Sequence, residues 1–495
     1  MHWNRRSGTA FAIAIAFCIA GCTSTSGRPL GGPTSAAVGR TAGGAPDSGQ
    51  HIADPGRPAP GSARSTDSLL PGQGNGGYDA THYNVAIEYD PATRMLTGST
   101  TITATTTQAL SSFDLDLHAL SVTSVTVGGK PATFALAHDK LTITPPHPIR
   151  LGGTVTTTIR YGGIPRPYVD PNLGTNGFIP LRDGAIEVSQ PQGASTWYPL
   201  NDRLTDKATY DITITAPTRL AALSNGRLAS KRVDGPRTTW RWVENSPMVG
   251  YLALVAIGKY RVTMTSHDHL PVVLAVADSL PRTIDAELAR TPEILDFLES
   301  QFGPYPFDAV GGVVHPDGDL DGLETQTIPA YPISEFDTPS DAYSDIAHEL
   351  THQWFGDNVA IADWSDIWLN EGFATYAEWL WSQHIGGPTP KQMFDKLYRE
   401  GDLPHRPPGK PTLAKLFGNS VYVRGAATLE ALRIAVGDVA FWRIVRGWAK
   451  LHAGGNATTA QFIAYADRIS GKSVDTLIHS WLDTRGTPPY PQPLR

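Results

Sequence analysis

The chain has 495 residues, and its 40% hydrophobic content is enough to build cores for two or three domains. The formal net charge is −7, from 40 basic and 47 acidic residues without a long run of either sign, which argues against nucleic acid as a partner. Both cysteines lie within the first 22 residues, so only His, Asp and Glu remain as metal ligands in the rest of the chain.

The N-terminus has the features of an export signal over residues 1–21. Arg5 and Arg6 precede an apolar run from residue 10 to residue 20, which is too short to span a membrane stably. The run ends in Ile-Ala-Gly followed by Cys22, which resembles the lipobox of bacterial lipoproteins. The resemblance implies lipidation of Cys22 and an exported protein anchored to the outer face of the bacterial cell membrane.

Residues 22–75 are predicted to form a flexible tether after the lipidated cysteine. Gly, Ser, Ala, Thr and Pro dominate this stretch, and its few large apolar residues cannot offset the entropy lost on ordering. As a random coil it would hold the folded part ~40 Å from the anchor.

Residues 76–262 are predicted to form an all-β domain. Segments such as 83–89, 99–105 and 154–161 alternate with period two and are rich in Thr, Val and Tyr, which is typical of strands with one solvated face. Glycine pairs, such as the one at 152–153, mark turns between them.

From residue 263 to residue 495 the pattern predicts a mainly helical domain, which makes the chain α+β. Ser340 and Ser365 are candidate helix caps. The predicted helices cover residues 286–302, 340–355, 365–384, 390–399, 421–436, 439–452, 459–469 and 474–482.

A candidate zinc site lies in the second of these helices. His348 and His352 are four residues apart, so they share one helix face and can bind one metal ion, and Glu349 lies beside that ion as a candidate general base. A catalytic zinc needs a third protein ligand. Glu371 is the candidate, because it lies among large apolar residues of the next helix, where a carboxylate needs a partner.

The sequence from His348 to Asn358, HELTHQWFGDN, and the sequence WLNEGFA around Glu371 resemble the gluzincin aminopeptidases, typified by aminopeptidase N and leukotriene hydrolase. The resemblance implies a saddle-like N-terminal β domain, a thermolysin-like catalytic domain and one Zn²⁺ per chain. The long C-terminal helical domain of larger members has no counterpart here, so a short form with a more open site is expected.

The same resemblance implies roles for three more residues. Tyr422, in Tyr-Val-Arg-Gly, corresponds to the tyrosine that stabilises the oxyanion in the family motif Tyr-x-Lys-Gly. Glu324, in Asp-Gly-Leu-Glu-Thr, corresponds to the glutamate that binds the substrate amine, although Leu and Thr replace the Met and Asn of the family motif. Gln192, in a loop of the β domain, is expected to help bind the amino terminus.

The predicted function is that of a zinc aminopeptidase acting on peptides with a free N-terminus. Two alternatives within the hydrolases stay open because the motif around Glu324 is altered: an endopeptidase and an epoxide hydrolase. An alternative of another class is a surface lipoprotein that binds a ligand on an inactive peptidase scaffold.

Overall fold

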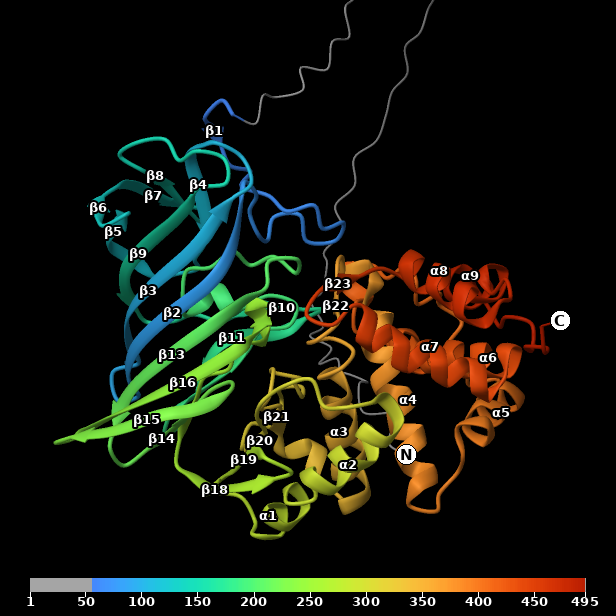
Figure 1. Cartoon of the computed structure of the whole chain (residues 1–495). Helices are drawn as coiled ribbons and strands as arrows, with labels where there is room; N and C mark the ends of the chain where they lie inside the picture. The colour runs from blue at the N-terminus through green and yellow to red at the C-terminus, as the bar shows by residue number, and fades with distance from the viewer. Residues whose placement is uncertain (1–55, 495) are drawn as a thin grey trace, which may run out of the picture. The chain divides into compact units, whose positions relative to one another are not determined.

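The computed structural model describes residues 56–494 (Figure 1). The strands of the first half, up to Gly258, form three sheets, and the helices follow in the second half. In Figure 1 these strands group on the left and the orange and red helices on the right. The predicted α+β class, with a β domain before a mainly helical domain, is confirmed.

The largest sheet forms the body of the β domain. Its strands are β2 (Tyr78–Asp90), β3 (Met95–Thr106), β5 (Ser121–Val127), β6 (Lys130–Pro131), β9 (Thr154–Gly163), β13 (Ala208–Pro217), β15 (Arg227–Asp234) and β16 (Arg237–Met248). Their order is β15-β16-β13-β2-β3-β9-β5-β6. In β13, Ile212 and Ile214 are buried while Asp211 and Thr213 are not, so one face packs on the core, as the alternation predicts.

Two smaller sheets complete the β domain. One contains β1 (Ala59–Pro60), β4 (Leu110–Asp116), β7 (Thr133–Ala137) and β8 (Lys140–Thr144) in the order β1-β4-β8-β7. The other contains β10 (Tyr168–Asp170), β11 (Gly174–Pro180), β12 (Ala185–Val188), β14 (Ala221–Leu223) and β17 (Ala256–Gly258) in the order β10-β11-β12-β17-β14. The loop that follows β12 leads to the candidate site.

The second domain begins with a sheet that the sequence pattern did not predict. Its strands, in order, are β18 (Tyr260–His267), β19 (Leu270–Ala277), β20 (Val310–His315) and β21 (Ala330–Pro332). β19 and β20 are buried, nearly continuous apolar runs, which periodicity alone cannot distinguish from helix. The predicted domain boundary between residues 262 and 263 falls inside β18.

The helices follow the predicted ranges, with shifts at their ends. They are α1 (Thr283–Leu288), α2 (Thr291–Phe302), α3 (Pro339–His352), α4 (Trp368–His384), α5 (Pro390–Glu400), α6 (Gly425–Val436), α7 (Asp438–Leu451), α8 (Thr459–Ser470) and α9 (Asp475–Asp483). The predicted helix 286–302 is two helices, because Pro292 in the first turn starts a new one. Thr338 and Asp363, rather than Ser340 and Ser365, accept the capping hydrogen bonds.

The tether prediction is wrong for residues 56–75, the part of it that the structure describes. Asn75 is fully buried, and Leu69 and Leu70 pack against the core. Ser68 donates two hydrogen bonds to Asp363, 295 residues away. The composition resembles that of a flexible coil, but these long-range bonds order the segment. Cys22 and residues 1–55 lie outside the described residues.

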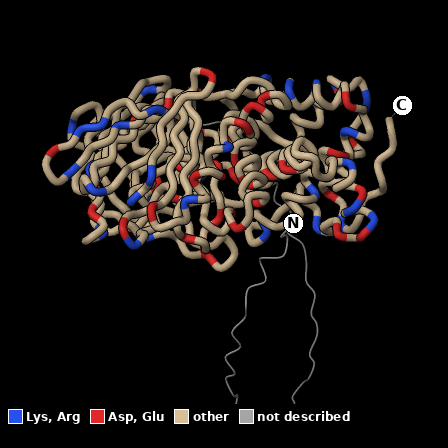
Figure 2. Tube along the Cα trace, turned by 90° about the horizontal axis from the view of Figure 1, so that it is seen from below, with Lys and Arg blue, Asp and Glu red and all other residues tan. Residues whose placement is uncertain are grey.

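The described chain contains no helix that is both long and apolar enough to cross a bilayer. Basic and acidic positions are interspersed along the described trace (Figure 2).

Candidate functional site

Helix α3 carries the first three site residues. Thr338 accepts a hydrogen bond from the backbone N–H of Asp341 and thereby fixes the start of the helix. Two and a half turns later the helix buries His348, Glu349 and His352, which are 9%, 7% and 1% exposed. The predicted spacing therefore places both imidazoles on one buried helix face.

Helix α4 packs against α3 and brings the third candidate ligand. Oε2 of Glu371 lies 3.4 Å from Nε2 of His348 and 3.5 Å from Nε2 of His352. Zinc bonds of about 2.1 Å at tetrahedral angles would separate ligand atoms by about 3.4 Å. The three predicted ligands therefore fit one zinc ion.

Hydrogen bonds at Nδ1 of His348 and His352 leave Nε2 of each ring to bind a metal. Nδ1 of His348 donates to Oε1 of Glu378 at 2.7 Å, and Nδ1 of His352 donates to the carbonyl of Phe355 at 3.2 Å. Because carboxylate and carbonyl oxygens only accept, both rings carry a proton on Nδ1, and Nε2 of each ring faces Glu371.

The electrostatics of the site favour a cation. Burial opposes protonation of His352, but Glu371 and Glu324 raise its pKa to about 9. Burial also opposes ionisation of Glu371, yet His352 and His348 lower its pKa to about 2. A cluster of this kind stabilises positive charge at the point where the three ligands converge.

Glu378 was missed by the sequence analysis. It lies seven residues after Glu371 on α4, so two turns of one helix supply both the ligand and the acceptor for His348. Ser344 donates to the other oxygen of Glu378 at 3.3 Å and so orients this carboxylate. The seven-residue spacing was the available signal.

Glu349 lies beside the ligands and beside a second buried carboxylate. A carboxylate oxygen of Glu349, one of Glu324 and a ring nitrogen of His352 lie within 4.8 Å of one another. Burial raises the pKa of Glu349 to about 7, against the opposing effect of His348 and His352. This value suits a group that accepts and returns a proton at neutral pH.

Glu324 is 2% exposed and is held from two sides. Gln190 donates to its Oε1 at 2.7 Å, and the hydroxyl of Tyr251 donates to the same oxygen at 3.0 Å. Its backbone carbonyl accepts from Gln353 at 3.1 Å. Both side-chain donors therefore meet the same carboxylate oxygen, Oε1.

The loop after β12 reaches the site as expected, but through a different residue. Among the described residues, the loop amide that contacts Glu324 belongs to Gln190, whereas Gln192 is half-buried two residues further on. Tyr251, in a short 3₁₀ helix (Gly250–Leu252), is a further partner that no sequence pattern indicated.

Tyr422 lies in a π-helical turn (Ser420–Arg424) that leads into α6. Its ring is stacked near that of His348, with 6.0 Å between ring centroids and 25° between planes. Turns of this kind are frequent at functional sites. The structure thus places the predicted oxyanion donor next to a zinc ligand.

A pair of glycines sets how closely α4 approaches this turn. A Cβ at Gly372 would lie 2.9 Å from the carbonyl carbon of Gly425, and a Cβ at Gly425 would lie 2.9 Å from Cα of Gly372. The backbones therefore touch directly, one residue after Glu371 and three residues after Tyr422.

Arg424, which replaces the lysine of the family motif, is fully buried. Its guanidinium donates to five backbone carbonyls: those of Pro404, Ser480, Trp481, Thr484 and Gly486. Arg424 thus ties the turn to the segment that ends α9 and to the loop after α5.

Comparisons with known proteins agree with this geometry. Residues 79–252 match the family model described as "Peptidase M1 N-terminal domain", and residues 286–481 match "Peptidase family M1 domain". The two matches cover the β domain and most of the helical domain.

Several curated aminopeptidases are similar to the chain. Aminopeptidase M1 of Arabidopsis thaliana is 27% identical over 327 residues, which cover 61% of this chain and 37% of that protein. Aminopeptidase N of Streptomyces lividans is 27% identical over 308 residues, 57% of this chain and 36% of that protein. The chain spans about a third of the length of these relatives.

Solved structures match over more of their length. The M1 zinc metallopeptidase from Deinococcus radiodurans has a TM-score of 0.80 and 29% identity, covering 86% of this chain and 98% of that chain. A mutant of that protein bound to a Tyr-Ser-Ala substrate has a TM-score of 0.79 and 29% identity, covering 86% of this chain and 99% of that chain. With its His-His-Glu ligand set, the chain belongs to the M1 peptidase family of zinc metallopeptidases.

Proposed function

We propose that the protein is a zinc aminopeptidase, which removes residues from the free N-terminus of peptides. One observation carries the proposal: two buried carboxylates, Glu324 and Glu349, lie together beside the zinc ligand His352. One carboxylate suits a general base, and the other suits the ammonium group of a peptide's amino terminus.

Each residue around the ligands has a distinct task. His348, His352 and Glu371 would hold a zinc ion, which would supply a Lewis acid for the scissile carbonyl and lower the pKa of a bound water. Glu349 accepts the proton of the attacking water and returns it to the leaving amine. Tyr422 donates a hydrogen bond to the oxygen on which negative charge develops.

Glu324 selects and orients the substrate. Its Oε2 binds the substrate ammonium group while Gln190 and Tyr251 hold Oε1. Binding the amine at a fixed distance from Glu349 places the first peptide bond, rather than a later one, at the reacting centre. The names of the similar aminopeptidases, and the Tyr-Ser-Ala peptide bound by the Deinococcus radiodurans mutant, support peptides as the substrate class.

A panel of reporter substrates tests the proposal. Aminoacyl 4-nitroanilides and their N-acetylated forms are compared before chelation, after chelation and after zinc is added back. We expect cleavage of the free-amine forms alone, loss on chelation and recovery with zinc. The matched control is Glu349→Gln, which keeps the shape of the side chain, binds zinc and turns over no substrate.

Each other result favours one of the alternatives. Equal cleavage of the acetylated substrates indicates an endopeptidase. Epoxide hydrolysis without peptide cleavage indicates the second hydrolase alternative. Zinc binding with no turnover of either class indicates a binding protein on an inactive scaffold.

The proposal extends to where the enzyme acts. The Ile-Ala-Gly-Cys sequence that ends at Cys22, and the apolar run before it, support export and a lipid anchor on the outer face of the bacterial cell membrane. Expression in a bacterial host tests this: wild-type protein should partition with membranes and Cys22→Ser should not. Wild-type protein that stays in the aqueous fraction would contradict the anchor.

A further inference from the structure

Residues 67–75, called here the N-terminal strap, lie between the β domain and the helical domain. In Figure 1 the blue loop that follows β1 reaches toward β22 (Ala360–Ile361). The residue Asp363, which the strap contacts, lies shortly after β22 in the chain. The strap precedes β2 and lies outside both family matches. It contacts Pro191 and Trp364, which are neighbours of the two residues that hold Glu324, Gln190 and Tyr251.

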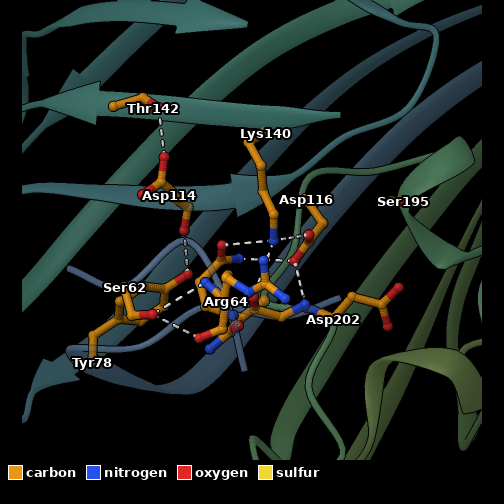
Figure 3. Close-up of polar contacts among 12 residues, drawn as sticks. Ser62, Arg64, Tyr78, Asp114, Asp116, Lys140, Thr142, Ser195 and Asp202 are labelled. Carbon is orange, nitrogen blue, oxygen red and sulfur yellow. Dashed lines mark hydrogen bonds and ion pairs between the residues drawn. The ribbon is translucent and has the colours of Figure 1, made fainter. Parts of the chain in front are cut away.

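The strap is fixed to the β domain by a buried ion pair. Lys140 and Asp116 are partners on β8 and β4, 2.5 Å apart, and Figure 3 shows them with the backbone of Asp202. Asp116 accepts from the backbone N–H of Gly74 and from the side chain of Asn75, and Lys140 donates to the Gly74 carbonyl. A buried charge pair with its hydrogen bonds satisfied holds this end of the strap rigidly.

One arm of the strap supports the loop that carries Gln190. Nε2 of Gln73 donates to the carbonyl of Pro191 at 2.9 Å. Pro191 directly follows Gln190, whose side chain donates to Oε1 of Glu324 at 2.7 Å. Gln73 is therefore connected to Glu324 through Pro191 and the side chain of Gln190.

The other arm supports Tyr251. Asp67 accepts from the backbone N–H of Trp364 at 2.8 Å, and Ser68 donates to Asp363 through its backbone N–H and its hydroxyl. The ring of Trp364 packs on that of Tyr251 with 5.4 Å between centroids. Tyr251 is the second donor to Oε1 of Glu324.

We propose that the strap positions Glu324, with Gln73 as the positioning residue of one arm and Asp67 as that of the other. This inference rests on the proposed role of Glu324 in binding the substrate amine. Both side-chain donors to Glu324 are supported by the strap, so removing one arm lets Oε1 move and weakens amine binding without touching zinc, Glu349 or Tyr422.

The test uses the zinc-loaded full-length protein and two probes, leucine hydroxamate and its N-acetyl derivative. Calorimetry measures the dissociation constant of each probe, and the ratio of the two constants is the selectivity for the free amine. Gln73→Leu should raise the constant of the free-amine probe about three- to ten-fold, the value of one lost hydrogen bond, and leave that of the acetylated probe unchanged. With nitroanilide substrates the same variant should raise KM and keep kcat.

The chain offers a matched control for this variant. Gln108 also donates from Nε2 to a proline carbonyl, that of Pro60, at 3.1 Å, and so also holds the N-terminal segment to the β domain. This bond has no link to Glu324. Gln108→Leu should therefore leave the amine selectivity unchanged, whereas a general loosening of the N-terminal segment would lower it in both variants.

A double-mutant cycle separates positioning from general damage. In a Glu324→Ala background, Gln73→Leu should cause no further loss of affinity for the free-amine probe, because the carboxylate that Gln73 positions is gone. The inference is overturned if Gln73→Leu weakens free-amine binding equally in the Glu324→Ala background. It is also overturned if Gln73→Leu leaves the selectivity for the free amine unchanged, or if the wild-type protein binds both probes equally. Amine-selective binding that depends on Gln73, without any hydrolysis, would instead refute the aminopeptidase proposal alone.

Discussion

Oε1 of Glu378 lies 2.7 Å from Nδ1 of His348, on the side of the ring opposite to Glu371. This hydrogen bond fixes the tautomer of His348 and makes its Nε2 a stronger metal ligand. We expect Glu378→Ala to weaken zinc binding about 10- to 100-fold. Competition with a chelating indicator measures the change.

Glu378→Gln serves as the graded variant. Its amide oxygen still accepts from Nδ1 but carries no charge, so its zinc affinity should lie between those of wild type and Glu378→Ala. Glu400→Gln, on α5 beside Lys396, is the exposed control and should bind zinc as wild type does. Unchanged affinity in Glu378→Ala would show that the bond does not support the ligand.

Tyr422→Phe should reduce kcat by a factor of about a hundred or more while zinc content stays at one per chain. The variant keeps the ring stacked near His348 and removes only the hydroxyl. Steady-state kinetics and metal analysis on the same sample measure both quantities. Full activity in this variant would remove Tyr422 from the mechanism.

Arg424→Met should lower the free energy of unfolding by about 3 kcal/mol, because five backbone carbonyls, of which that of Trp481 is buried, lose their charged donor. Urea unfolding measures the loss. Arg424→Lys restores the residue of the family motif but supplies fewer donors in a different geometry, so its loss should be smaller than that of Met. A Met variant as stable as wild type would contradict this account of the turn.

His315, at the end of β20, should make stability depend on pH. It is fully buried, both ring nitrogens lack a hydrogen-bond partner among the described residues, and burial lowers its pKa from 6.5 to about 4. Between these values the unfolded chain binds the proton and the folded chain does not. The free energy of unfolding should therefore fall as pH decreases from 6.5 toward 4, by up to about 3 kcal/mol.

Urea unfolding of His315→Leu at several pH values isolates this contribution. The cavity left by the substitution lowers the free energy of unfolding by an amount that does not depend on pH. The quantity to compare is therefore the slope of the free energy of unfolding against pH. His315→Leu should show a shallower fall than wild type, whereas His147→Leu, at an exposed position, should not. Equal slopes in wild type and His315→Leu would exclude His315 as the cause.

The sequence predicted the metal ligands because short helical spacings determine their geometry. His348 and His352 meet on one face of α3 wherever that helix packs, and Glu371 lies among apolar residues that bury it. Glu378 also precedes large apolar residues, Trp379 and Leu380, but it lies in neither of the short motifs that indicated the ligands. Only the packing of α4 on α3 shows that it faces His348.

Loop directions and long-range contacts could not be predicted from local patterns. Gln190 and Gln192 are equally polar and lie in one loop, and which of them turns toward Glu324 depends on the fold of that loop. The strap has the composition of a disordered segment, yet it is ordered by partners such as Asn201 and Asp363, 126 and 295 residues away. The composition of a segment contains no information about the distant residues with which it forms hydrogen bonds.

The contact between Gly372 and Gly425 limits how this site can be altered. Two backbones that already touch have no shorter separation available, and any side chain at either position acts as a spacer between the ligand helix and the tyrosine turn. The distance from Glu371 to Tyr422 therefore cannot be tuned in small steps at this crossing. Directed evolution toward new substrates should keep both glycines and substitute other residues that line the site.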